Sequence, residues 1–373
     1  MDPRLLRGRV EQVPVRDEDR GASGRYSLLR SRPGNAPTGN EHGRGQARVR
    51  RPRTQGRPGT PADQGRSTVR VGPESQVTPQ IPDVVLQRWE VSPASYLGGR
   101  LNQHWLVEHR HSQLVVRGYS DEAFPHINYE LEVLARLDDA GWPVPSAVEE
   151  PIQIDRLTWC LFKLLPGTCR ASNEPEERRA RGRLLAELHQ TTASLTRTGQ
   201  RRGFGLSDEV MGDPGLIDSI RNYEQRRPSE GHVMRWHVDQ AAQVFDRLDL
   251  DEAVTTVLHG DFAPWNLLYE GENLTGVLDF EATHLNYRVA DFANSWRGYQ
   301  DEVIEGYEEV CKLSDLDWEL LMPVYWAWMF IEVKKSIETS LEENTALPDF
   351  EWQIRHLLRR EGLTGRLARP YPK

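Results

Sequence analysis

The chain has few cysteines and no long uninterrupted apolar run. Its 373 residues include three cysteines, Cys160, Cys169 and Cys311, and their spacing matches neither a zinc site nor a disulfide framework. No stretch approaches the roughly 18 apolar residues that a membrane span needs, and no apolar signal region opens the sequence. We therefore expect reduced structural cysteines and a soluble, cytoplasmic protein without a membrane partner.

Residues 1–80 lack lysine and nearly lack aromatic residues. They contain 16 Arg and 8 Asp or Glu, which gives a net charge of +8. Because the whole chain has a net charge of −9, residues 81–373 carry −17. The segment is rich in Gly, Pro, Ser and Gln and has no apolar periodicity, which predicts a disordered Arg-rich extension. A nucleic-acid-binding arm is the functional alternative, but Tyr26 is its single aromatic residue. Nucleic acid is therefore an unlikely partner, and an idle extension, a misassigned start or a transit peptide are the other interpretations.

From residue 81 the pattern changes to apolar segments separated by turns. The stretches "SYLGGRLNQHWLVEH" and "SQLVVRGYS" predict antiparallel strands, with a turn at Gly98 and Gly99. A helix is predicted next, because Leu131, Leu134 and Leu137 recur at three-residue steps. "RLTWCLFKLLPG" predicts one more strand. Residues 81–165 should therefore form a small β-rich unit.

Residues 166–373 are predicted to be mainly helical. One predicted helix carries an apolar stripe of Ala180, Leu184, Leu185 and Leu188. A second, near the end of the chain, carries Leu321, Val324, Trp328 and Ile331, with Pro323 either kinking it or marking its start. Trp326 falls outside that stripe, so we consider it a candidate to face a cleft. His189 is interpreted as a packed core residue.

The stretch "HGDFAPWN", residues 259–266, places an acid and an amide on a loop. It follows the apolar run "AVTTVL" and precedes "NLLYEGENLTGVLDF", which predicts a hairpin with the turn "EGEN". The hairpin should return Asp279 to the loop, so the oxygens of Asp261, Asn266 and Asp279 should converge. Glu281 is expected on the same strand and face as Asp279. Such oxygen ligands suit Mg²⁺ together with substrate phosphates.

This order of residues resembles the catalytic loop of protein kinases, which runs His-Arg-Asp, four residues, Asn. With Gly260 in second place, it resembles more closely the aminoglycoside phosphotransferase family, whose signature HGDxxxxN precedes a strand ending in DF(D/E). The resemblance covers roughly residues 90–335 and is most specific over residues 259–281. It implies an α+β, two-lobed protein-kinase-like fold with a small antiparallel β N-lobe over residues 81–165. The larger, mainly helical C-lobe would span residues 166–373.

The same resemblance implies roles for the loop. Asp261 would be the catalytic acceptor of the substrate hydroxyl proton. Asn266 and Asp279 would hold Mg²⁺, and Glu281 would reach the ion through water. His259 is expected to support the loop from below. Asp291 is expected to be a buried acid that accepts hydrogen bonds from the backbone of the catalytic loop.

The resemblance places the nucleotide, ATP, against the N-lobe. Its phosphates would lie under the turn of Gly98, Gly99 and Asn102, and Arg117 would contact them while Glu130 orients Arg117. Leu165 would lie at the hinge beside adenine. Two simpler interpretations stay open here: the glycines form a plain hairpin turn, and Arg117 with Glu130 forms a surface ion pair.

The implied function is an ATP-dependent phosphotransferase acting on a hydroxyl of a small molecule. An aminoglycoside, an amino alcohol, homoserine or a sugar-like compound would be the acceptor, and the charge of −17 favours a cationic one. Residues 200–235 and the C-terminal helices are expected to form its pocket, with "RGFGLSDEVMGDPG" as a loop that closes over it. The alternative is a catalytically silent nucleotide-binding pseudokinase or regulator.

Overall fold

The structure, a computed structural model, describes residues 80–99, 102–120, 126–170, 174–295 and 301–358. The Arg-rich extension predicted over residues 1–80 therefore lies outside the described residues, apart from Gln80. The described chain folds as α+β, with the sheet and helices separated along the molecule, as predicted.

Five antiparallel strands form the main sheet of the N-terminal part. Their bounds are β1 Ser92–Gly98, β2 Gln103–His109, β3 Ser112–Ser120, β4 Ile152–Ile154 and β5 Leu157–Lys163. They lie in the order β1-β2-β3-β5-β4, and each neighbouring pair is antiparallel. The predicted strands are confirmed, and β1 ends at Gly98, the first residue of the turn predicted at Gly98 and Gly99.

The two faces of this sheet pack against different partners. On one face, Trp105, Val107 and Trp159 form a small core with Val85 of helix α1 (Asp83–Arg88). The opposite face packs against helix α2 (Ile127–Asp139) and belongs to the large core that continues into the helical part. Because the two parts share this core, α2 connects the sheet mechanically to the helices.

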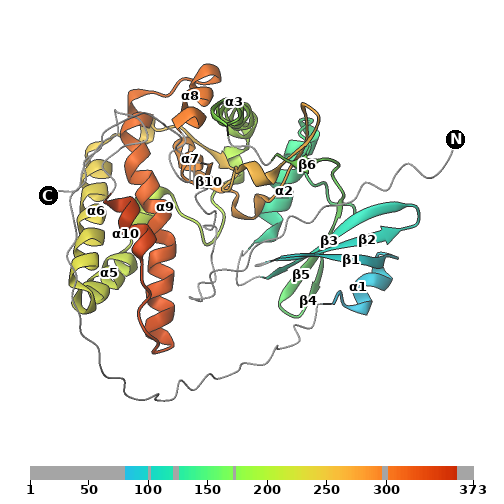
Figure 1. Ribbon diagram of the computed structural model, residues 1–373, viewed down its shortest axis with the longest axis horizontal. Helices are drawn as coiled ribbons and strands as arrows, with labels where there is room; N and C mark the ends of the chain where they lie inside the picture. Colours follow the sequence, from blue (N-terminus) through green and yellow to red (C-terminus); the bar gives the residue numbers. More distant parts are fainter. Residues whose placement is uncertain (1–79, 100–101, 121–125, 171–173, 296–300, 359–373) are drawn as a thin grey trace, which may run out of the picture.

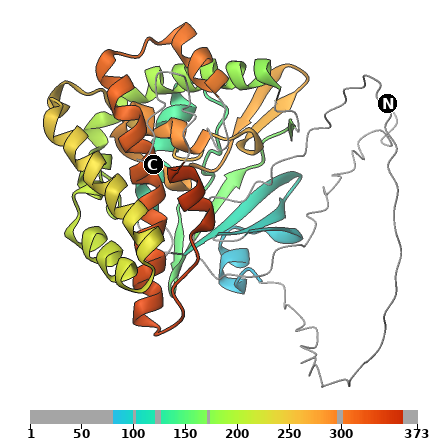
Figure 2. The same cartoon turned by 60° about the vertical axis from the view of Figure 1, so that its left-hand side comes forward.

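Helices make up most of the C-terminal part. Their bounds are α3 Pro175–Thr192, α4 Ser207–Met211, α5 Pro214–Arg226, α6 Pro228–Arg247, α7 Asp291–Ser295, α8 Asp301–Val310, α9 Asp315–Glu342 and α10 Glu351–Leu357. Short 3-10 turns lie at η1 Ala193–Thr198, η2 Leu250–Glu252, η3 Pro264–Asn266, η4 Phe280–Ala282 and η5 Arg288–Ala290. Figure 1 shows α5, α6, α9 and α10 at one end of the molecule and the five-stranded sheet at the other, with α2 and α3 between. The turned view in Figure 2 shows the same separation.

Two small sheets lie where the parts meet. Strand β7 (Thr255–Leu258) pairs with β10 (His284–Tyr287), and β8 (Leu267–Glu270) pairs with both β6 (Thr168–Cys169) and β9 (Asn273–Val277). The predicted hairpin is thus confirmed, because β8 ends and β9 begins at the ends of the expected polar turn. These strands hold both ends of the catalytic-loop candidate.

The apolar stripe predicted for α3 is only partly right. Leu185 and Leu188 are buried, but Ala180 is exposed and Arg181 is buried instead. A Cβ atom on Gly182 would lie 2.0 Å from the backbone oxygen of Val303, and one on Gly306 would lie 1.9 Å from that of Arg179, so the backbones of α3 and α8 approach closely at two glycines. The face of α3 that contacts α8 is therefore centred on a glycine. A search for apolar periodicity does not detect such a face, because glycine has no side chain.

The stripe predicted for α9 is also partly wrong. Leu321 and Val324 are buried, whereas Ile331 is 51% exposed. Trp326, expected to face a cleft, is buried and its ring lies 4.9 Å from that of His237. The helix is packed on several sides, so a single stripe does not describe it. Pro323 lies inside α9 and does not start it.

The stretch over residues 202–215 is not an irregular loop throughout. It contains helix α4 and the start of α5, whose first turn is capped by Asp213 accepting from the backbone nitrogen of Gly215 over 2.9 Å. Glu209 and Asp213 thus accept backbone hydrogen bonds at the starts of α4 and α5.

Two further properties bear on the class of protein. Among the residues that the structure describes, no helix combines the length and apolar character needed to cross a bilayer. Cys160, Cys169 and Cys311 are free cysteines, but only Cys160 is buried.

Candidate active site

The loop 259–266 is fixed from below by Asp291. The backbone nitrogens of His259 and Gly260 each donate to one carboxylate oxygen of Asp291, over 2.8 Å in both cases. Nε2 of His189 lies 3.0 Å from the same carboxylate. Burial alone would raise the pKa of Asp291, but the hydrogen bond and charge of His189 hold that pKa below its usual value. Asp291 is therefore a buried carboxylate that positions the loop.

His259 links the loop to the segment that carries Asp279. Its Nδ1 accepts from the backbone nitrogen of Asp261 over 3.1 Å, so Nε2 carries the proton and donates to the carbonyl oxygen of Leu278 over 2.9 Å. Burial lowers the pKa of His259. A neutral imidazole therefore joins the two segments structurally, and no contact of His259 with a reacting group is required.

Asn266 brings the third residue to the loop. Its side-chain nitrogen donates to the carbonyl oxygen of Asp261 over 2.8 Å and to a carboxylate oxygen of Asp261 over 3.2 Å. The backbone nitrogen of Leu278 donates to the backbone oxygen of Asn266 over 2.8 Å, which places Asp279 directly beyond the end of the hairpin. The structure thus places the chain that carries Asp279 next to the loop that carries Asp261 and Asn266, and the Asp279 carboxylate contacts Arg117.

Glu281 and Asp279 do not share a strand, because β9 ends at Val277, so that expectation was wrong. The backbone of Asp279 is left-handed, with φ of 67°, and residues Phe280–Ala282 form the 3-10 turn η4. The carboxylate of Glu281 accepts from Asn102 and forms an ion pair with Arg117. It is therefore directed towards the N-terminal sheet.

Arg117 lies among three carboxylates. Besides Glu281, its guanidinium lies 3.1 Å from Asp279 and 3.6 Å from Glu130. The hydroxyl of Tyr119 donates to Glu130 over 2.9 Å. Arg117 is only 8% exposed and Glu130 only 1%, so the alternative of a surface ion pair is excluded.

Two of the acidic groups around Arg117 have raised pKa values. Burial, followed by the nearby charge of Asp279, raises the pKa of Glu281 to about 8. Burial also raises the pKa of Glu130, although Arg117 opposes that shift. One guanidinium cannot fully compensate three carboxylates, so this cluster favours additional positive charge.

The glycine turn is linked to the site through Asn102, which donates to Glu281. Gly98 and Gly99 have φ of 102° and 143°, and a Cβ on Gly99 would lie 1.8 Å from the backbone oxygen of Asn102. Only glycine fits this backbone, which leaves peptide groups uncovered by side chains. Asn102 is buried and connects the turn to Glu281 across the two parts.

The described residues offer a modest set of metal ligands. Because the amide nitrogen of Asn266 is used by Asp261, its oxygen is the atom available to a cation, and the Asp279 side chain is 35% exposed. No group of three His, Cys, Asp or Glu side chains arranged to hold a metal occurs in the described part. Two protein oxygens fit an ion whose other ligands are phosphates and water, as is usual for Mg²⁺.

Comparison with known proteins agrees with this geometry. Residues 94–322 match the phosphotransferase enzyme family. The chain belongs to that family.

Two relatives are similar to parts of this chain. A homoserine kinase from Zymomonas mobilis is 27% identical over 190 residues, which cover 46% of this chain and 57% of the relative. An aminoglycoside 3'-phosphotransferase from Streptomyces fradiae is 26% identical over 191 residues, which cover 49% of this chain and 68% of the relative. The first match thus spans little more than half of that relative.

Solved structures show the same fold at low identity. Aminoglycoside phosphotransferase APH(4)-Ia, solved in one case with ADP and hygromycin B, is 16% identical with a TM-score of 0.52 over 74% of this chain and 95% of its own. Spectinomycin phosphotransferase APH(9)-Ia, solved with ADP and spectinomycin, is 12% identical with a TM-score of 0.51 over 74% of this chain and 92% of its own. The protein-kinase-like fold is therefore confirmed.

His104 lies near the site but was not predicted from the sequence. It lies directly opposite Arg117 in the β2–β3 pairing and therefore on the same face of the sheet. Burial, followed by the charge of Arg117, lowers the pKa of His104 to about 4, so the ring is neutral near pH 7. The alternation of strand residues over 103–109 was the signal that could have identified it.

Arg201 was also missed. It is 1% exposed and donates to the backbone oxygens of Glu281 and Thr283 over 2.8 and 3.0 Å, which fixes the turn η4. Nothing local in "QRRGFG" distinguishes Arg201 from its exposed neighbour Arg202.

The hinge candidate Leu165 lies between the two parts. It follows β5 of the large sheet and precedes β6, which pairs with β8 beside the catalytic loop. Leu165 is half-buried, and Leu164 is 42% exposed. Its contact with adenine stays a prediction.

Proposed function

We propose that this protein transfers the γ-phosphoryl group of ATP to a hydroxyl of a small molecule. The observation that carries the proposal is the link from Asn266 to Asp261 over 3.2 Å, with Asp279 held beside Asn266 by the backbone bond from Leu278. This is the arrangement that phosphoryl transfer needs, with an acid for the attacking hydroxyl beside oxygen ligands for the cation.

Each residue of the loop has a distinct part in the reaction. Asp261 orients the acceptor hydroxyl and accepts its proton as the oxygen attacks the γ-phosphorus. Asn266 holds the Asp261 carboxylate in place, so the hydroxyl is aligned before reaction. Asn266 and Asp279 would hold Mg²⁺, which would neutralise phosphate charge when bound. Glu281 reaching that ion through water stays part of the proposal.

The N-lobe, residues 81–165, would bind the nucleotide. Arg117 is directed at the site by Glu130, and its planar guanidinium can bind phosphate oxygens in a forked geometry. The backbone of Gly98 and Gly99, with Asn102, would cover the phosphates. The C-lobe, residues 166–373, would contribute the catalytic loop and the acceptor pocket.

The acceptor is proposed to carry an amino group as well as a hydroxyl. Homoserine and aminoglycosides, which appear in the names of the relatives, both carry ammonium groups at neutral pH. The charge of −17 over residues 81–373 would raise the local concentration of such cations. Closure of residues 202–215 over the acceptor, checked by limited proteolysis with and without it, and a cytoplasmic location, checked by cell fractionation, stay predictions.

A phosphate-transfer screen with amino alcohols, homoserine, aminoglycosides and sugars tests the proposal. Asp261→Asn should lower turnover of any accepted substrate by on the order of 10²- to 10⁴-fold. Thermal stabilisation by Mg·ADP should be retained in that variant. Asp246→Asn, which changes an exposed acid of α6, is the matched control.

The results also separate the alternative function. Binding of Mg·ADP with no turnover of any acceptor would favour a pseudokinase or regulator. Equal turnover by wild type and Asp261→Asn would remove Asp261 from its role.

A further inference from the structure

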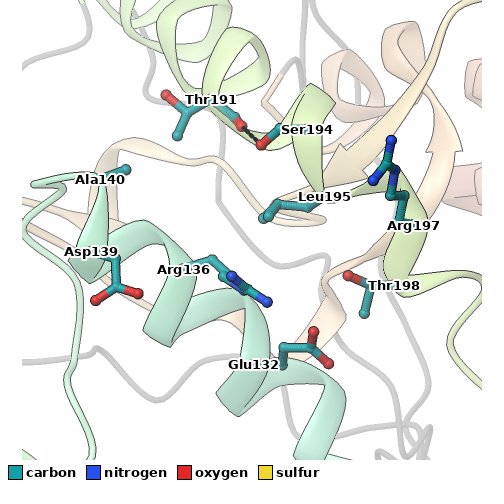
Figure 3. A pocket seen from close by; sticks show the side chains of 9 residues that line it. All are labelled: Glu132, Arg136, Asp139, Ala140, Thr191, Ser194, Leu195, Arg197 and Thr198. Atoms are coloured by element: carbon teal, nitrogen blue, oxygen red, sulfur yellow. Dashed lines mark hydrogen bonds between the residues drawn. The ribbon is translucent and has the colours of Figure 1, made fainter.

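We propose a second ligand site between α2 and the segment that follows α3, for a small organic anion that also carries hydroxyl or ammonium groups. A pocket of about 660 Å³, open to solvent on one side, lies between these two elements, and its charged residues Glu132, Arg136 and Arg197 are exposed (Figure 3). That volume lies in the range of small-molecule sites. None of its lining residues belongs to the site of Asp261.

The cavity is bounded by hydrogen bonds at both ends. At one end the hydroxyl of Tyr129 donates to the backbone oxygen of Gly199 over 3.1 Å. At the other, Nε1 of Trp142 donates to the hydroxyl of Thr191 over 3.0 Å. Helix α2 is therefore tied to the C-lobe before and after the cavity, while the stretch between the ties is left apart.

Each wall contributes an arginine. Arg136 projects from α2, and Arg197 comes from the facing segment η1 (Figure 3). Neither guanidinium forms an ion pair with a carboxylate of the described residues. Both arginine side chains are exposed, so each can rotate to bind a carboxylate or phosphate group of a ligand between the walls through paired hydrogen bonds.

Neutral and acidic side chains of the pocket place a second requirement on the ligand. Glu132 and Thr198 line the same part of the cavity as Arg136, whereas Asp139 points away from Leu195 (Figure 3). Ser194 adds a hydroxyl, which donates to the backbone oxygen of Thr191 over 3.0 Å. A ligand therefore needs donors, such as hydroxyl or ammonium groups, to satisfy Glu132 in addition to its anionic group.

The two walls lead directly to the catalytic machinery. Glu130, which contacts Arg117 over 3.6 Å, precedes Glu132 by two residues on α2. The segment with Arg197 leads to Arg201, which donates to the backbone oxygen of Glu281 over 2.8 Å. A ligand that contacts both walls would restrict the motion of Glu130 and Arg201. Anion binding should therefore increase the affinity for the nucleotide. This coupling, unlike the site itself, rests on the proposed function.

Calorimetric titrations of the full chain test the site. Glycerol 3-phosphate, glycerate and inorganic phosphate are added with the nucleotide site filled by Mg·AMP-PNP, which occupies all three phosphate positions, so that phosphate groups cannot enter it. We expect glycerol 3-phosphate or glycerate to bind with one-to-one stoichiometry, and the better of the two identifies the anionic group. The double variant Arg136→Gln, Arg197→Gln should weaken this binding by at least about tenfold.

Two further variants keep the test independent of folding. Ser194→Trp should prevent binding by filling the cavity without changing charge. Arg226→Gln, which removes an exposed arginine of α5, should bind as wild type does. Absence of saturable binding, or equal binding by wild type and the double variant, overturns the site.

The coupling has its own readout. The dissociation constant of Mg·ADP should fall on the order of fivefold when the anion is bound. An unchanged constant overturns the coupling. If the protein binds no ADP at all, the proposed function fails, and the anion titrations without nucleotide still decide the site.

Discussion

Asn266 donates from one side-chain nitrogen to both the backbone oxygen and a carboxylate oxygen of Asp261, over 2.8 and 3.2 Å. The two bonds fix the rotation of the Asp261 carboxylate relative to its own backbone. The loop therefore presents its acid in one orientation before any substrate binds.

Asn266→Ala should lower turnover on the order of 100-fold, because a misplaced catalytic group loses alignment with the acceptor. It should also raise the Mg²⁺ concentration needed for half-maximal rate, since one proposed oxygen ligand is lost. Steady-state rates over a Mg²⁺ series measure both effects. Asn273→Ala, at an exposed position in β9, is the control. Wild-type turnover at saturating Mg²⁺ would contradict the role.

Gly260→Ala should destabilise the protein by more than about 2 kcal/mol. The φ of Gly260 is 87°, and an added Cβ would lie 2.3 Å from the backbone oxygen of Ala282, which cannot rotate away. Gly271→Ala is a sharp comparison, because that glycine also has positive φ but no atom within 4 Å of the added Cβ. Urea unfolding measures both variants. Equal losses would show that backbone strain, not the contact with Ala282, determines the effect.

Asp291→Asn should lower the free energy of unfolding by about 3 kcal/mol at neutral pH, because an amide cannot accept from both backbone nitrogens and His189 as the carboxylate does. The pKa of Asp291 is lowered in the folded protein. Its contribution is therefore fully present above the unfolded pKa of about 3.9 and is lost as the pH falls through the lower folded pKa.

The difference between wild type and Asp291→Asn should thus shrink below about pH 4. Urea unfolding from about pH 3 to pH 7 follows it, with the exposed Asp246→Asn as control. A difference independent of pH would show that the charge of Asp291 is not what stabilises the loop.

Arg117→Lys should raise the KM for ATP about tenfold, equivalent to about 1.4 kcal/mol. A single ammonium cannot contact Asp279, Glu281 and Glu130 in the geometry of the guanidinium and also present a fork to phosphate. Arg110→Lys, in the exposed turn between β2 and β3, should leave KM unchanged. An unaltered KM in Arg117→Lys would exclude a forked phosphate contact.

Much of the framework could be predicted because its signals are local. The polar turn at residues 270–273 with apolar residues on both sides predicts the β8–β9 hairpin, and the hairpin then places Asp279 near Asn266. Strand alternation and the glycine pair likewise predict β1 and β2. These features depend on neighbours within about ten residues, where periodicity and turn chemistry act.

The rest depends on contacts distant in sequence. Asp279 adopts a left-handed backbone without being glycine, and the 3-10 turn η4 follows it, so Glu281 does not lie on a strand as expected. Arg201 reaches across 80 residues to the carbonyl of Glu281. The burial of Trp326 follows from packing on several sides of α9, which a one-stripe pattern does not represent.

The guanidinium of Arg117 is shared by the carboxyl groups of Asp279, Glu281 and Glu130. A phosphate that contacts Arg117 must come close to these acids, so a nucleotide should bind better with a divalent counter-ion than without one. The protein would then discriminate against free ATP by electrostatics alone, before any shape recognition begins.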